Sequence, residues 1–186
     1  DIYVVSGIPP VQYAQTVGTG WQFISFPIAA SGAVDTVFDD SIFGDGNCDW
    51  SIVQWYDAND PADHWKSYVV GAAGASDMPV MDNAKGAWIY ITSNTGDGQL
   101  TLGLMAPPPV STDIGLVGGW NLVGYPANDD STYDIGDLKA DTGATIVETF
   151  GAGPYNLVEP TDNTVLNRGQ AYWVYVGGPT TWTVNW

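Results

Sequence analysis

The amino-acid sequence contains one pattern twice, and this repeat restricts the fold more than any other feature. Residues 20–27 read Gly-Trp-Gln-Phe-Ile-Ser-Phe-Pro, and residues 119–126, 99 positions later, read Gly-Trp-Asn-Leu-Val-Gly-Tyr-Pro. The Trp-Ile-Tyr-Ile of residues 88–91 recurs as Trp-Val-Tyr-Val at residues 173–176, 85 positions later. Because the repeat keeps apolar, strand-like stretches and varies the polar stretches between them, it predicts an architecture rather than a chemistry.

The composition is typical of an all-β protein. Among 21 acidic residues only Glu148 and Glu159 are Glu, and the rest are Asp, which favours turns over helices. The chain also has 23 Gly and 12 Pro among many Val, Ile, Thr, Tyr and Trp residues. Together with the repeat, this predicts two tandem homologous domains from an internal duplication, each a β-sandwich or small β-barrel of roughly 90 residues.

Proline runs indicate where these domains begin. Pro9 and Pro10 follow a short apolar run, and a triproline at residues 107–109 precedes the second copy of the pattern. We therefore predict an N-terminal strand and connector at residues 1–10, a first β domain at residues 11–106 and a second β domain at residues 107–186.

Apolar runs between turn-forming residues predict the strands of each domain. In the first domain they lie at residues 22–26, 33–38, 52–56, 65–70, 88–92 and 99–104, and in the second at residues 121–125, 133–138, 145–150, 155–158, 172–176 and 181–185. A short turn at residues 133–139 is an alternative to a strand there. Residues 22–26 and 88–91 carry large apolar side chains on both faces, so we expect central strands covered on both sides. The repeated pairs Trp21 with Trp120 and Trp88 with Trp173 are accordingly expected in the core.

The apolar run at residues 2–5 is a surplus strand, because no β domain precedes it. It can pair with an edge strand of the first domain, or it can complete a sheet in a neighbouring molecule by β-strand donation. In the C-terminal run 182–186, apolar and polar residues alternate, so Trp182, Val184 and Trp186 share one face. That face would be adhesive if the strand lacked a partner. The residues expected to form a polymerisation contact are Ile2, Tyr3, Val4, Val5, Trp182, Val184 and Trp186.

Strong acidity limits the partners. The formal net charge is −17, and Lys66, Lys85, Lys139 and Arg168 are the only Lys and Arg residues, so most of the surface would repel phosphate. We therefore expect that nucleic acid is not a partner. We also expect no membrane insertion, since the chain lacks an apolar run long enough to span a bilayer. A start at Asp1 rather than Met is typical of a mature protein, which predicts an extracellular or cell-surface location after signal-peptide removal.

One loop resembles a calcium-binding loop. Asp45, Asn47 and Asp49 place oxygen ligands at alternate positions, but the glycine and the terminal Glu of an EF-hand are missing. A Gly/Asp turn explains the same residues, and a calcium site completed by Asp39 or Asp40 is the alternative.

The sequence predicts no catalytic residues and no enzyme. His64 is the only histidine, Cys48 is the only cysteine, and neither belongs to a recognisable nucleophile motif. Nearly all Asp residues lie in turn-like stretches, whereas the two carboxylates of a glycoside hydrolase usually project from a defined cleft. Unpaired tryptophans such as Trp65 would instead suit a sugar-binding surface, so polysaccharide is an alternative partner to a second copy of the chain.

The two versions of the pattern resemble a β-rich repeat of secreted and cell-surface proteins of bacteria and archaea. The residues that carry this likeness are Gly-Trp-Asn-Leu-Val-Gly-Tyr-Pro at 119–126 and Ala-Tyr-Trp-Val-Tyr-Val at 171–176, with their counterparts at 20–27 and 86–91. The resemblance implies a non-catalytic structural or adhesive role. We therefore expect a structural subunit of an extracellular filament or surface assembly, with a carbohydrate-binding or calcium-dependent adhesion module as the alternative.

Overall fold

The protein is mostly β-structure. The computed structural model describes residues 9–78, 80–108, 110–127, 132–151 and 156–185, so the predicted donor strand 2–5 and Trp186 lie outside the described residues. Strands make up 46% of the structure and helices 11%, and the sheets in the described ranges are antiparallel and do not close into a barrel. The all-β prediction is confirmed.

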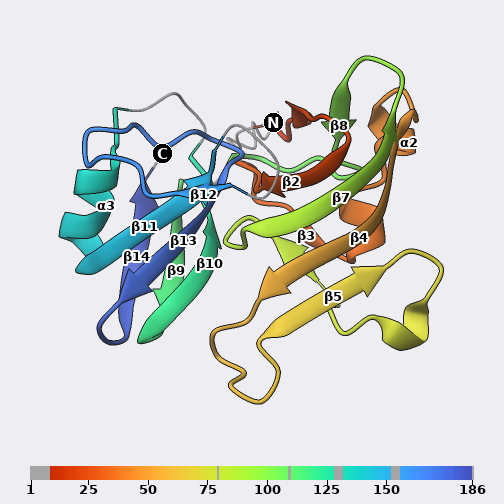
Figure 1. The fold of residues 1–186 in the computed structure, drawn as a ribbon. Coiled ribbons are helices and arrows are strands. Elements are labelled where there is room, and N and C mark those ends of the chain that lie inside the picture. Colours follow the sequence, from red (N-terminus) through yellow and green to blue (C-terminus); the bar gives the residue numbers. More distant parts are fainter. Residues whose placement is uncertain (1–8, 79, 109, 128–131, 152–155, 186) are drawn as a thin grey trace, which may run out of the picture.

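The first half, residues 11–106, contains one four-stranded sheet and two short two-stranded sheets (Figure 1). The larger sheet has the spatial order β2 (Gly20–Ile24), β7 (Ala87–Asn94), β4 (Cys48–Tyr56) and β5 (Trp65–Val69). The smaller sheets pair β1 (Ala14–Thr16) with β8 (Gln99–Thr101) and β3 (Ser31–Gly32) with β6 (Met81–Asp82), and a 3₁₀ turn covers Ala73–Ala75.

The second half, residues 107–186, contains a four-stranded sheet with the same relation between strand order and sequence. Its spatial order is β10 (Gly119–Gly124), β13 (Ala171–Val176), β11 (Ala144–Phe150) and β12 (Leu157–Val158). A long two-stranded sheet pairs β9 (Ser111–Leu116) with β14 (Thr180–Asn185). The expected boundary between residues 106 and 107 lies between β8 and β9.

The repeated residues occupy the same register in the two larger sheets. Trp21 on β2 lies opposite Tyr90 on β7, and Trp120 on β10 lies opposite Tyr175 on β13. Their rings meet at centroid distances of 5.3 Å in both pairs. The sequence pattern therefore specifies strand pairing down to individual side chains.

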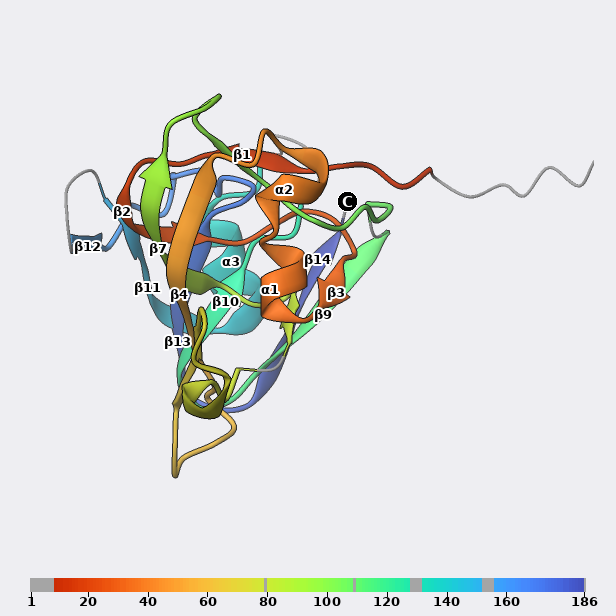
Figure 2. The same cartoon turned by 90° about the vertical axis from the view of Figure 1, so that its right-hand side faces the viewer.

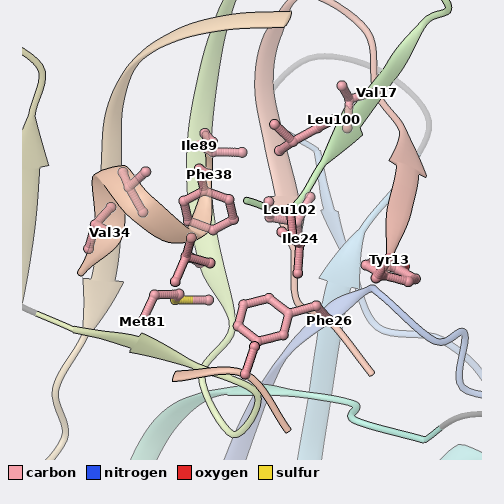
Figure 3. Packing of buried hydrophobic residues seen from close by; sticks show 14 of the residues in the cluster. Tyr13, Val17, Ile24, Phe26, Val34, Phe38, Met81, Ile89, Leu100 and Leu102 are labelled. Carbon is pink, nitrogen blue, oxygen red and sulfur yellow. The ribbon is translucent and has the colours of Figure 1, made fainter. Parts of the chain in front are cut away.

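Each half has its own hydrophobic core. In the first half, Ile24, Phe26, Val34, Phe38 and Ile89 are among the side chains that fill the space between the larger sheet, β8 and the helix that starts at Val34 (Figure 3). The second core gathers mainly around side chains of β9, β13 and β14, among them Ile114, Leu116, Val174, Trp182 and Val184. Such burial supplies most of the driving force for folding.

Two predicted strands are helices instead. Residues 33–38 contain α1 (Val34–Val37), which buries both valines and is followed by α2 (Asp40–Phe43). The second predicted strand, at residues 133–138, overlaps the start of α3 (Ile135–Thr142). The alternative prediction of a short turn there is closer to the observed helix. The cause in α3 is capping: Asp134 and Asp137 form a reciprocal capping box, and Gly143 ends the helix with φ 71°. These local bonds outweigh the strand preference of the apolar residues.

The expectation of a central strand at residues 22–26 is also wrong. That strand, β2, lies at the edge of its sheet, as its repeat counterpart β10 does, whereas β7 and β13 each have a neighbouring strand on both sides. The structure also adds strands β1 and β9, which were not expected because their polar residues hide the alternation. In β9, Ile114 and Leu116 are buried while Asp113 and Gly115 are exposed.

The two larger sheets lie beside each other in the molecule, as Figure 1 shows, and in the turned view of Figure 2 α1, α2 and β3 lie to one side of strands β2, β7 and β4. Backbone contacts join them at repeat-equivalent positions, because Ile24 bridges to Gln170 and Val123 bridges to Lys85. The hydroxyl of Ser25 also donates to the Gln170 carbonyl at 2.8 Å. In the described residues, no helix is long and apolar enough to cross a membrane.

Candidate binding groove

An aromatic groove of about 420 Å³ opens on the surface where the two halves meet. Its lining residues come from β4, β5 and β7 of the first half and from β10, β11, β12 and β13 of the second half. They are Tyr56, Trp65, Trp88, Trp120, Glu148, Leu157 and Trp173, and we call this set the aromatic groove.

Strand alternation places the groove's tryptophans. On β7, Ile89 and Ile91 point into the first core. Because side chains alternate along a strand, Trp88 points to the opposite face of the sheet. On β13, Val174 belongs to the second core, and its neighbour Trp173 points to the groove. The pattern that builds the two cores thus also builds an aromatic surface on the opposite face of each sheet.

Trp173 lies at the centre of the groove and touches three other rings. Tyr56, Trp65 and Trp120 meet it at centroid distances of 5.1, 5.8 and 6.2 Å, with interplanar angles of 64°, 75° and 86°. Edge-to-face contacts of this kind are favourable because the positive ring edge meets the negative ring face. The walls of the groove are therefore set at steep angles to one another.

The Trp55 side chain joins the two halves at their junction. The Trp55 indole Nε1 donates to the Leu122 carbonyl at 3.1 Å, and the Lys85 ammonium lies 4.9 Å from the centroid of the Trp55 ring. Lys85 also forms an ion pair with Asp82. The Trp55–Leu122 hydrogen bond thus crosses between the halves, whereas both Lys85 contacts lie within the first half.

Glu148 is the only carboxylate among the described lining residues of the groove. Its side chain is half-buried and has no hydrogen-bond or ion-pair partner among the described residues. The three lysines are paired elsewhere: Lys66 with Asp60 and Asp63, Lys85 with Asp82, and Lys139 with Asp162 and Glu159. Glu148 is thus a carboxylate beside aromatic faces whose charge no described lysine neutralises.

His64 supports a wall of the groove. Its ring stacks on Tyr56 with centroids 4.6 Å apart and an interplanar angle of 19°, and its Nδ1 lies 2.9 Å from the Asp57 carbonyl oxygen. Cys48 is buried in the first core, where burial together with nearby Asp40 raises the pKa of its thiol to about 12. Neither side chain is arranged as a nucleophile and base.

The residues predicted for a polymerisation contact fall into two sets. Ile2, Tyr3, Val4, Val5 and Trp186 lie outside the described residues. Trp182 and Val184 are 0% and 4% exposed in the second core, and their strand β14 pairs with β9 over its full length. The Trp182 indole donates to the Tyr133 hydroxyl at 3.0 Å. The side chains of these two residues therefore serve packing within the chain rather than an exposed adhesive face.

The predicted calcium loop is a hydrogen-bonded turn. Asp45 Oδ1 accepts from the Asn47 amide at 2.9 Å, and Asp45 Oδ2 accepts from the Asp97 amide at 2.7 Å. These backbone bonds hold the pKa of the Asp45 carboxyl below its usual value. Asp49 is exposed on β4. In the described part of the chain, no three His, Cys, Asp or Glu side chains are grouped to hold a metal ion.

Of the repeated tryptophans that line the groove and were expected in the core, Trp173 is buried, as predicted, in a cluster with Phe23, Leu122 and Ala171. Trp88 and Trp120 are half-buried on the outer faces, and Trp65, which has no repeat partner, is 45% exposed. The alternation could have revealed this, because Trp88 and Tyr90 share the face opposite Ile89 and Ile91. What the pattern lacks is any indication that two such faces meet.

Comparison with known proteins gives no relative from which a function could be transferred. The chain matches no protein-family model, no curated protein and no solved structure.

Proposed function

We propose that the chain is a non-enzymatic binding module that holds a polysaccharide in the aromatic groove. The observation that carries this proposal is that four tryptophans and a tyrosine line one surface groove, in which Trp65 is 45% exposed and Trp173, 9% exposed, belongs to the hydrophobic cluster at the junction. A patch of this kind commonly marks a binding surface, because isolated proteins rarely leave large aromatic areas in contact with water.

The chemistry of the groove suits a sugar. A pyranose ring presents C–H groups on its faces and hydroxyl groups around its rim, so it can cover an aromatic ring while hydrogen-bonding to a polar neighbour. The exposed ring of Trp65 and the half-buried rings of Trp88 and Trp120 offer the apolar faces. Glu148 offers carboxylate oxygens that accept from hydroxyl groups.

Binding without cleavage is the role that the lining residues favour. Glycoside hydrolysis usually needs two carboxyl groups on opposite sides of the scissile bond, and Glu148 is the single carboxylate among the described lining residues. The lone His64 is engaged as a support for Tyr56. A retained polysaccharide would thus leave the groove chemically unchanged.

The test is co-sedimentation of the protein with insoluble cellulose, chitin and chitosan. We expect retention on at least one of them, and we expect Trp65→Ala to weaken it about tenfold, equivalent to ~1.4 kcal/mol. Because Trp65 is 45% exposed, its truncation should leave the fold intact. Phe43→Ala is the matched control, since Phe43 is a similarly exposed aromatic residue on α2, outside the groove. Retention on none of the three, or equal weakening by both variants, would refute the proposal.

We also infer that the two halves are homologous domains from an internal duplication and that the protein acts outside the cell. The matched register of Trp21 with Tyr90 and of Trp120 with Tyr175 supports the duplication. The acidic, Asp-rich composition and the polysaccharide partner support an extracellular or cell-surface location.

Self-assembly into a filament through strand donation stays a prediction. The apolar run at residues 2–5, which is surplus to the repeat, supports it. Electron microscopy of the protein beside a variant lacking residues 1–8 tests it, because filaments that vanish on truncation would establish donation and the absence of filaments in both samples would reject it. Calcium-dependent adhesion has weaker support, since backbone amides already occupy the Asp45 oxygens.

A further inference from the structure

We propose that the polysaccharide in the aromatic groove carries free amino groups, and that Glu148 holds one of them as an ammonium ion. This inference rests on the proposed function and narrows its ligand to glucosamine-type polymers. It starts from the half-buried Glu148 carboxylate, which has no ion-pair partner among the described residues and lies in a groove otherwise lined by one leucine and five aromatic rings.

The charge of the whole chain favours a cationic ligand. With a net charge of −17, the protein attracts cations over the range of the Debye length and repels anionic polysaccharides such as uronic-acid polymers. The chain's lysines form ion pairs away from the groove, so no described lysine competes for Glu148. A neutral sugar would leave this charge uncompensated, whereas an ammonium group pairs with it.

The arrangement of the rings also suits a compact cation. An ammonium ion is attracted to the face of an aromatic ring within about 6 Å, and most strongly to tryptophan. Trp65 and Trp120 stand at 75° and 86° to Trp173. Such steep walls form corners in which one small cation can meet two ring faces, while the flat sugar ring covers a third.

The carboxylate belongs to one half only. Glu148 on β11 lies opposite Trp173, and at the same register position in the first half Gln54 on β4 lies opposite Trp88. Gln54 donates to the Ser67 hydroxyl at 3.4 Å. The groove is therefore charged at the second half and neutral at the first, so replacing Glu148 by glutamine makes both positions alike without changing the side-chain shape.

The experiment compares two soluble oligosaccharides with the same backbone, glucosamine oligomers and N-acetylglucosamine oligomers of equal length, by calorimetric titration. Acetylation leaves the sugar backbone unchanged and converts each ammonium group into a neutral acetamide. We expect the glucosamine oligomer to bind at least about tenfold more tightly, because a charge-assisted hydrogen bond to a carboxylate is among the stronger polar contacts. Glu148→Gln should abolish this difference.

Asp49→Asn is the matched control, since it removes one carboxylate charge from the exposed far end of β4. We expect it to leave the preference unchanged. If both variants reduce glucosamine binding equally, the attraction is a general effect of net charge and the inference is overturned. Equal binding of both oligomers overturns the inference while leaving the polysaccharide function in place. If neither oligomer binds and the co-sedimentation assay finds no retention, the proposed function fails as well.

Discussion

The ring of Phe150 on β11 meets the ring of Trp88 on β7 edge to face, with centroids 5.1 Å apart and an interplanar angle of 82°. At the repeat-related position, Tyr56 on β4 meets Trp173 on β13 at the same distance. Each contact joins a strand of one half to a strand of the other. The walls of the aromatic groove therefore hold their positions only while the two halves stay docked.

Close approach at this junction predicts that glycine is required at residue 86. A Cβ atom on Gly86 would collide with the Val123 carbonyl oxygen and would lie 2.6 Å from the Ala171 side chain, and neither neighbour is flexible. We expect Gly86→Ala to destabilise the protein by about 1–3 kcal/mol, the usual cost of overpacking, which thermal unfolding would detect.

Gly115→Ala provides the control for that substitution, because a Cβ atom there has no neighbour within 4 Å. Its melting temperature should stay close to that of the unchanged protein. An equal loss in both variants would mean that the junction is not as tight as described.

The buried carboxylate of Asp40 is expected to stabilise the first half. Asp40 is 4% exposed, its Oδ1 accepts from the Thr101 amide at 2.8 Å, and its Oδ2 accepts from the Gly46 amide at 3.0 Å. Asp40→Asn turns one acceptor into a donor that faces an N–H group, so we expect a loss of about 1.5–3 kcal/mol in urea unfolding. The exposed Asp49→Asn should unfold like the original protein.

Alkaline pH should destabilise the first core through Tyr13. Burial raises the pKa of this phenol to about 12, while nearby Arg168 opposes the shift. The neutral phenol is therefore favoured in the folded state, so its contribution is complete below pH ~10, the unfolded value, and is lost as pH rises through about 12. We expect the urea midpoint to fall less between pH 8 and pH 11 in Tyr13→Phe than in the unchanged protein; an equal fall in both would contradict this assignment.

Cys48 should be unreactive in the folded protein. Its side chain is 6% exposed, and the raised pKa of its thiol keeps the reactive thiolate scarce at neutral pH. We expect iodoacetamide to label Cys48 only after unfolding in urea, as mass spectrometry would record. Rapid labelling under native conditions would contradict the burial of this residue.

The repeat predicts the β-structure well because it encodes strand pairing directly. Trp21, Trp120, Tyr90 and Tyr175 take matching positions in their sheets, as equivalent residues of a repeat should. Alternation does not predict α2 and α3, because these helices depend on the side-chain caps of Asp39 and Asp134 rather than on periodicity. In α3 the capping residue Asp134 lies within residues 133–138, whose apolar members Tyr133, Ile135 and Leu138 are equally compatible with a strand.

The groove could not be predicted because it depends on contacts between distant segments. Alternation alone indicates that Trp88 faces away from Ile89, but it leaves open whether a second sheet covers that face. The structure brings Trp173, 85 residues later, to the same surface and leaves Trp65 exposed beside it. Trp182 was misassigned for the same reason, since its burial depends on β9, about 70 residues earlier in the chain.

The most direct test of the polysaccharide site is nuclear magnetic resonance of the tryptophan indole N–H signals during titration with a soluble glucosamine oligomer. We expect shifts for Trp65, Trp88, Trp120 and Trp173, which line the groove. The signals of Trp50 and Trp182, whose indoles donate to the Phe38 carbonyl and the Tyr133 hydroxyl away from the groove, should stay in place. Shifts at Trp50 or Trp182 without shifts at the groove tryptophans would contradict the account.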